Sequence, residues 1–230
     1  MCGRFTLFAS MPVLSKMFDA PGSGDLAPRY NIAPSQTILA VRVSPATGLR
    51  DFLRARWGLV PSWSKDPSIG NRLINARSET VHVKPAFRSA FRDRRCLIPA
   101  SGFFEWRRID GRKQPYFIRM RDGSPFALAG LWEPGKEPED PVGTCAILTT
   151  ESNSVVSPLH DRMPVIVGPD RYEQWLAPGA GSPDSLKPLL APWPPGGMEA
   201  WPVGPRVNNP RIDDEECVAL FRGTVPPVAE

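Results

Sequence analysis

The chain has 230 residues, 28 of them proline, with a formal net charge of +4 at pH 7. The proline content is far above the usual ~5% and excludes a fold of long helices, while the length allows one large domain or two small ones. No apolar run approaches the ~20 residues of a membrane span, and no signal-peptide core follows Met1. We therefore expect a cytoplasmic monomer without membrane contact.

The predicted elements are mainly short strands separated by turns. Apolar and β-branched patterning predicts them at residues 3–8, 36–43, 51–57, 96–99, 102–108, 114–120, 126–131, 144–150 and 164–167. Helices are expected after an N-cap at Ser10, at residues 86–94 and at residues 170–176, and the Pro- and Gly-rich stretch 178–195 is expected to be a surface loop with one helical turn. Such a pattern is typical of an α+β fold: a β-rich single domain over residues 1–222, with a curled, barrel-like mixed sheet, short peripheral helices and a disordered tail at 223–230.

The cysteines are scattered along the chain and form no C-x-x-C pair. Histidines do not lie between them at metal-ligand spacing. The four positions are Cys2, Cys96, Cys145 and Cys217. The sequence therefore predicts neither a zinc site nor a disulfide framework, and it indicates no cofactor.

The N-terminal segment carries the most specific chemistry. If Met1 is removed, Cys2 presents an amine and a thiol two carbons apart, a pair that closes on an aldehyde to give a five-membered thiazolidine. An α-amino group, with a reference pKa of about 7.7–8.0, is roughly a tenth free base at pH 7, whereas a lysine is almost fully protonated. The alternative is that a cysteine beside the start codon is accidental.

Three other places hold candidate polar groups, each with a structural alternative. The segment from Asn75 to Glu79 places an amide and a guanidinium after an apolar pair, but is also typical of a helix cap. Glu105 lies in an aromatic run, where burial would raise its pKa for acid–base work, although it also fits an exposed strand position. His160 lies in a proline-bounded loop beside Asp161 and Arg162, which suits proton transfer or a purely structural role.

Tryptophans and arginines indicate a nucleic-acid partner only weakly. Trp57, Trp63 and Trp106 are candidates for base stacking, with a core position as the alternative for each. An arginine cluster at positions 88, 92, 94 and 95 is expected to be a solvated face of the predicted helix. The positive net charge favours an anionic partner without identifying one.

Taken in order, six motifs together resemble the family of SOS response-associated peptidases. The motifs begin at residues 2, 75, 102, 149, 160 and 207: Cys-Gly-Arg, Asn-Ala-Arg-x-Glu, Gly-Phe-Phe-Glu-Trp, Thr-Thr-x-x-Asn, His-x-Arg-Met-Pro and Val-Asn. They extend over nearly the whole chain, and Ser152 departs from the alanine usual in the fourth motif. The resemblance implies one compact β-rich domain that binds single-stranded DNA and shields abasic sites through a thiazolidine link to the processed N-terminal cysteine.

The resemblance also implies roles for individual residues. Cys2 would be the nucleophile, Asn75 would hold its amine or the sugar, Glu105 would be the acid–base group, and His160 would assist proton transfer. The residues implied in DNA contact are Arg4, Arg77, Trp106, Thr149 and Arg162.

Three functions follow as hypotheses. The first is covalent capture of abasic sites, with weak lyase activity because a Schiff base can drain into β-elimination. The second is an N-terminal-nucleophile peptidase that removes its own Met1, and the third is a non-covalent single-strand binding module in which Cys2 has no chemical role. The expected place of the protein is the cytoplasm, on the nucleoid when it is bound to DNA.

Overall fold

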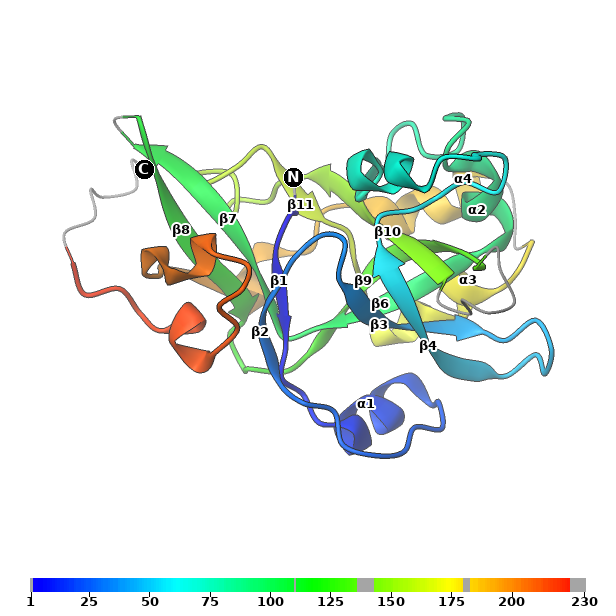
Figure 1. Cartoon of the computed structure of the whole chain (residues 1–230), viewed down its shortest axis with the longest axis horizontal. Coiled ribbons are helices and arrows are strands. Elements are labelled where there is room, and N and C mark those ends of the chain that lie inside the picture. Colours follow the sequence, from blue (N-terminus) through cyan, green and yellow to red (C-terminus); the bar gives the residue numbers. More distant parts are fainter. Residues whose placement is uncertain (1, 110, 136–142, 180–182, 224–230) are drawn as a thin grey trace.

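The computed structural model describes residues 2–109, 111–135, 143–179 and 183–223, and its strands form two sheets (Figure 1). In the five-stranded sheet the order is β13 (Met198–Pro202), β8 (Arg112–Met120), β7 (Gly102–Ile109), β1 (Phe5–Leu7) and β2 (Arg29–Ile32). In the eight-stranded sheet the order is β11 (Arg162–Pro164), β10 (Gly143–Glu151), β4 (Arg50–Trp57), β3 (Thr37–Val43), β6 (Arg95–Ala100), β9 (Phe126–Glu133) and β12 (Ile166–Val167), with β5 (Asn75–Arg77) paired to β10.

The eight-stranded sheet closes on itself. Strand β10 pairs in parallel with β4 and antiparallel with β9, and the path β4–β3–β6–β9 returns to β10. The expected β-rich α+β class with a curled mixed sheet is therefore confirmed. A second sheet was not expected; it arises because the chain passes from β6 to β7 through the single residue Ser101.

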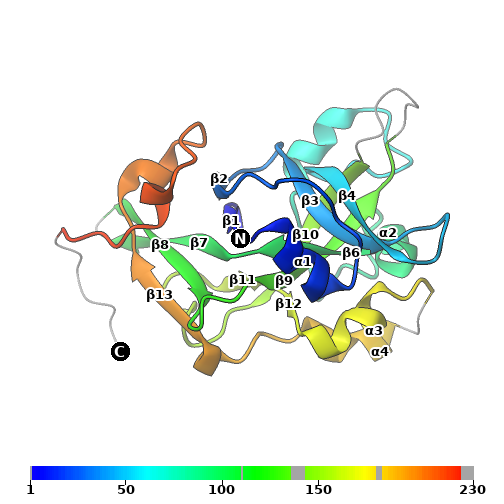
Figure 2. The same cartoon turned by 90° about the horizontal axis from the view of Figure 1, so that it is seen from below.

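Helices are short and lie around the sheets, as the proline content predicts. The α-helices are α1 (Met11–Phe18), α2 (Arg88–Asp93), α3 (Tyr172–Leu176) and α4 (Pro183–Leu186). The 3₁₀ helices lie at Pro67–Arg72, Pro169–Arg171, Lys187–Leu190, Pro195–Gly197, Pro205–Asn208 and Glu215–Val218. Figure 2 shows α2, α3 and α4 on the side of the eight-stranded sheet, away from β13 and the segment that follows it.

The larger cluster of buried apolar side chains includes residues of both sheets, among them Phe5 of β1 and Trp57 of β4. Trp57 is fully buried, its indole N–H donates to the Ile74 carbonyl at 2.8 Å, and its ring packs edge-on against Phe5 at 5.3 Å. Trp57 is thus unable to stack on a base, and the stacking hypothesis for this residue is wrong. Trp63, by contrast, is 60% exposed.

One arginine of the predicted solvated cluster is buried. Arg95 is 4% exposed, because it begins a central strand rather than extending the helix. Its guanidinium donates to the carbonyl oxygens of Phe91, Arg92 and Trp175. These carbonyls lie in the last turns of α2 and α3, where the helix itself supplies no donor. Burial lowers the pKa of Arg95, and the carbonyl dipoles stabilise the charge.

Some boundaries differ from the sequence-based expectations. The strand expected at 164–167 is two strands, β11 and β12, which pair with different neighbours on either side of Val165. Strands β2 and β13 were not predicted at all. The expected tail lies almost entirely outside the described residues, so the division into 1–222 and 223–230 stays a prediction. Among the described residues, no helix is both long enough and apolar enough to cross a bilayer.

Candidate functional site

The N-terminal residues reach the site by pairing with β7. Phe5 lies opposite Phe103 in the antiparallel β1–β7 ladder, and the Phe104 amide donates to the Arg4 carbonyl at 2.9 Å. The same register, continued toward the N-terminus, brings Gly3 opposite Glu105. Strand β1 therefore carries the start of the chain to the place where the acidic residue lies, and Figure 1 shows the N-terminus between β7 and β11.

Asn75 binds directly to the cysteine residue. It begins β5, which lies parallel to β10 with Asn75 opposite Ile147. Its side-chain Nδ2 donates to the carbonyl oxygen of Cys2 at 2.8 Å, while its Oδ1 is buried without a hydrogen-bond partner. The segment is a strand and not a helix cap, and it leaves one acceptor available beside Cys2.

Glu105 is buried in the middle of the five-stranded sheet. Its residue is 2% exposed, and alternation along β7 places it on the opposite side from Phe104 and Trp106, as the sequence predicts. Desolvation by burial raises the pKa of Glu105 to about 8, and the charge of Asp161 acts in the same direction. At neutral pH the carboxyl group is mostly protonated and can donate a proton.

His160 lies in the loop before β11, with its side chain 31% exposed. The Arg162 backbone N–H donates to Nδ1 at 2.9 Å, which requires Nδ1 to be unprotonated and the ring neutral. Asp161 Oδ1 lies 2.8 Å from the same nitrogen and would stabilise the ring once it is protonated. Burial, as the largest cause, lowers the pKa of His160. The ring is therefore neutral near pH 7 and has a carboxylate in place for when it takes up a proton.

The Cys2 thiol is fully buried. Burial, together with the negative charge of Glu105, raises its pKa far above the ordinary range for a thiol. The sulfur is therefore a protonated thiol in this form of the protein, whereas direct attack by cysteine requires the thiolate.

A cavity of about 510 Å³ joins these groups. Its lining residues are Gly3, Arg4, Glu105, Trp106, Arg108, Lys113, His160 and Asn208. Cys2 does not itself line the cavity, but Gly3 follows it in the chain and Glu105 acts on its thiol. A ligand in this cavity would approach the cysteine from the side of the acid and the imidazole.

Arg4 and Trp106 form one wall of the cavity. The Arg4 guanidinium lies 5.9 Å from the centre of the Trp106 ring and donates to Asn31 Oδ1 and to the Val207 carbonyl, each at 2.6 Å. The indole N–H of Trp106 donates to Asn208 Oδ1 at 2.7 Å. Much of the Arg4 hydrogen-bonding capacity is thus used within the protein.

The other expected DNA contacts lie on β5, β10 and β11. Arg77 is exposed opposite Thr149, which is 1% exposed and has a buried hydroxyl without a hydrogen-bond partner. Arg162 donates to Glu79 Oε2 at 2.9 Å and to the Thr149 carbonyl at 2.7 Å, and its side chain is 14% exposed. Arg77 is therefore available to a ligand, whereas Arg162 is mainly an anchor for the strand that follows His160.

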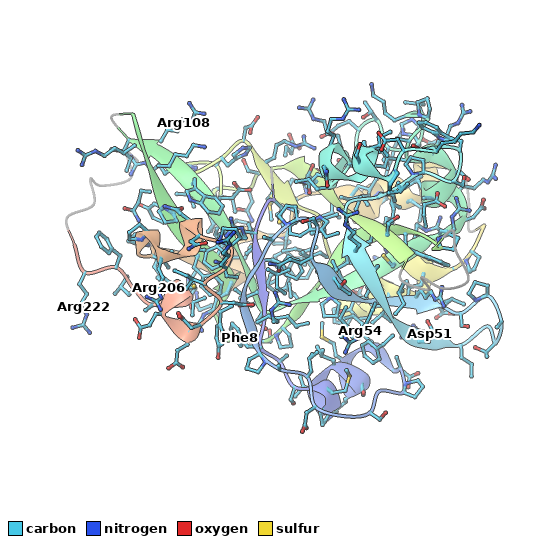
Figure 3. All side chains as sticks on the ribbon, viewed as in Figure 1. Phe8, Asp51, Arg54, Arg108, Arg206 and Arg222 are labelled. Atoms are coloured by element: carbon cyan, nitrogen blue, oxygen red, sulfur yellow. The ribbon has the colours of Figure 1, made fainter. Side chains whose placement is uncertain are left out.

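Arg108 and Lys113 were not expected at the site, and Asn208 was part of a motif without an assigned role. Arg108 and Lys113 are cross-strand partners near the tip of the β7–β8 hairpin, where Figure 3 shows the Arg108 side chain extending away from the sheet. Basic residues on both sides of the Asp-Gly pair at positions 110 and 111 of the sequence were the available signal. The Val-Asn motif does not by itself indicate a contact, and Asn208 reaches the cavity only through long-range packing.

The described residues include no group of three or more His, Cys, Asp or Glu side chains suited to hold a metal ion. All four cysteines are free and buried. The groups that line or adjoin the cavity are Cys2, an acid, an imidazole and several cations.

Comparisons with known proteins agree on one family. The model of the SOS response associated peptidase family matches residues 1–210. Abasic site processing protein YoaM of Bacillus subtilis is 43% identical over 95% of this chain and 97% of its own length, and abasic site processing protein HMCES of Gallus gallus is 32% identical over 88% and 69%. A crystal structure of a protein from Bacteroides thetaiotaomicron matches 96% of this chain and all of its own with a TM-score of 0.83, which at 24% identity supports the fold alone.

Proposed function

Because the chain belongs to the SOS response-associated peptidase family, we propose that it captures abasic sites in single-stranded DNA through a thiazolidine link to Cys2. The two relatives named above are abasic site processing proteins, which supports abasic-site DNA as the substrate. The observation that carries the proposal is that Asn75 holds the Cys2 carbonyl while Glu105 and His160 line the adjoining cavity.

The first step is opening of the sugar. An abasic deoxyribose is mainly a closed hemiacetal; opening it breaks the bond between C1′ and the ring oxygen, and the C1′ hydroxyl gives up its proton to water while the ring oxygen takes up a proton. Glu105, protonated at neutral pH because its pKa is raised to about 8, is placed to donate that proton. The product is a free aldehyde at C1′ within reach of the N-terminal residue.

The second step forms two bonds to C1′. The Cys2 amine adds to the aldehyde and water leaves, giving a Schiff base; the thiol then adds to the imine carbon and its proton passes to the nitrogen. The overall loss is one water molecule. Asn75 Oδ1, buried and without a partner, is placed to accept a hydrogen from the amine, and His160 to carry protons between the groups.

Met1 must be absent for this reaction, since an acylated nitrogen cannot form an imine. Met1 lies outside the described residues. Self-removal of Met1 is a second activity that we propose, because Gly3, which follows Cys2 in the chain, lines the cavity that holds Glu105 and His160. The raised pKa of the buried thiol favours hydrolysis of the Met1–Cys2 peptide bond by a water molecule over attack by a Cys2 thiolate.

Weak lyase activity belongs to the same proposal. The Schiff base intermediate can lose the 3′ phosphate by β-elimination before the thiol closes the ring. Rapid ring closure by the neighbouring thiol, favoured by its fixed position, keeps this path minor. The non-covalent binding module is the alternative in which none of these bonds form.

The test is incubation of processed protein with a single strand containing one abasic site, followed by denaturing electrophoresis after heating. Wild type should give a shifted band without any reductant. Cys2→Ser keeps the amine and loses the thiol, so it should give a band only when borohydride traps the imine, and Asn75→Ala should slow the wild-type reaction by about tenfold, the value of one hydrogen bond. A heat-stable band in Cys2→Ser without reductant would contradict the thiazolidine.

A further inference from the structure

Asn208 lies at the rim of the cavity, far in sequence from every other group there. It ends the 3₁₀ helix Pro205–Asn208, is exposed, and lines the cavity with Arg4 and Trp106. In the sequence, Asn208 belongs to the Val-Asn motif, to which no role was assigned.

The position of Asn208 is fixed by hydrogen bonds between β2 and the C-terminal segment. Asn31, which is fully buried, donates through Nδ2 to the Val207 carbonyl at 3.2 Å and to the Asn209 carbonyl at 3.0 Å. Arg4 donates to the same Val207 carbonyl. The backbone on both sides of Asn208 is therefore held, and its side chain cannot drift away from the cavity.

The orientation of the Asn208 amide follows from the chemistry of its partner. An indole nitrogen is a donor only, so the amide atom 2.7 Å from Trp106 Nε1 must be the oxygen. The amide nitrogen, with two N–H donors, then points the other way. Among the described residues it has no hydrogen-bond partner.

We propose that Asn208 is a DNA-contacting residue whose Nδ2 donates to a phosphate or sugar oxygen of the strand beside the abasic site. The inference rests on the proposed function, because it requires DNA in this cavity. Asn208 would then contact the DNA directly through Nδ2 while its Oδ1 holds the indole of Trp106. As a neutral donor, Asn208 would add affinity without adding to the charge contacts made by Arg108 and Lys113.

The experiment measures the affinity for an intact single strand and the rate of crosslinking to an abasic strand in wild type, Asn208→Leu, Trp106→Phe and the double variant. Asn208→Leu should weaken binding about three- to tenfold, the range for one hydrogen bond. The dependence of the binding constant on salt should keep its slope, since no cation is lost. Asn209→Leu, a change of the same kind at the next residue, serves as the control and should bind as wild type does.

The double variant separates a direct contact from a purely structural role. Trp106→Phe has no indole N–H, so a residue that acts only by holding the indole would have nothing left to hold. We expect Asn208→Leu still to weaken binding at least about threefold in the Trp106→Phe background. No further loss in that background would overturn the inference. Thermal unfolding of each variant shows whether the fold is kept, and absence of binding by wild type would instead refute the proposed function.

Discussion

At the scale of single residues, burial decides the chemistry of the cavity. The same desolvation that keeps the Cys2 thiol protonated keeps Glu105 protonated at neutral pH, and it keeps the His160 ring neutral. A neutral acid next to a neutral imidazole can give and take protons near pH 7. Exposed carboxylates, which are ionised near pH 7, could not donate protons there, and a charged histidine could not accept one.

The pH dependence of crosslinking follows from the α-amine of Cys2 and the carboxyl group of Glu105. The α-amine must be unprotonated, which favours pH above about 7.7–8.0, and Glu105 must be protonated, which favours pH below about 8. The rate should therefore rise and then fall, with a maximum near pH 8.

Glu105→Gln removes the acid, so we expect a loss of about a hundredfold at the optimum and no decline on the alkaline side. Single-turnover rates from pH 5 to pH 10 measure both limbs. An unchanged alkaline limb in Glu105→Gln would assign that limb to another group.

At the scale of elements, the start of β11 positions the histidine. The guanidinium of Arg162 joins Glu79 to the Thr149 carbonyl, and the backbone amide of the same residue contacts His160 Nδ1. Glu79 therefore fixes the loop that carries the imidazole, and the hydrogen bond from Arg162 lowers the pKa of Glu79. Arg162, which the family resemblance assigns to phosphate contact, is thus paired with Glu79 inside the protein.

Glu79→Gln tests this arrangement. Losing the ion pair should lower the maximal crosslinking rate about tenfold, because His160 loses its fixed position, while strand affinity should stay equal or increase, because a negative charge is removed. Titration of rate against DNA concentration separates the two effects. Glu151→Gln makes the same charge change on β10 and should leave the maximal rate unaltered; a loss of affinity with an unaltered rate in Glu79→Gln would contradict the positioning role.

The sequence predicted the elements whose patterning is local and missed those that depend on distant partners. Strands β6, β8 and β10 were predicted to within two residues, because their apolar residues are continuous or alternate. Strand β2 contains Asn31, a polar residue that is buried only because carbonyls near residue 208 satisfy it. Strand β13 ends in a proline and pairs with β8 across 80 residues of chain.

The candidate site shows the same division. Cys2, Asn75, Glu105 and His160 were identified from motifs, and the structure brings all four together. The ion pair of Arg162 and the cavity wall at Asn208 required the fold, since neither partner is near in sequence. Local chemistry is readable from residue types, but the partner of a long side chain is not.

At the scale of the whole molecule, three basic side chains are candidates for phosphate contact. Arg77, the last residue of β5, is exposed, and Arg108 and Lys113 line the cavity from the β7–β8 hairpin. Three phosphate contacts would give a slope of about −2 for the logarithm of the binding constant against the logarithm of salt concentration on single strands.

Lys113→Gln should make that slope shallower by about 0.7, because one phosphate contact is lost. Lys16→Gln on α1, which Figure 1 shows at the far end of β1 from the N-terminus, removes the same charge and should leave the slope as in wild type. Fluorescence anisotropy with an intact strand at several salt concentrations measures both. Equal changes in the two variants would indicate attraction by net charge alone.

Covalent capture at Cys2 is tested by the intact mass of the protein–DNA product, with peptide mapping of the attachment point. We expect the mass of processed protein plus abasic strand minus one water, with the strand attached at Cys2 and stable to heat without reduction. Attachment at a lysine, a product that needs borohydride, or no product from protein whose mass shows a free Cys2 would contradict it.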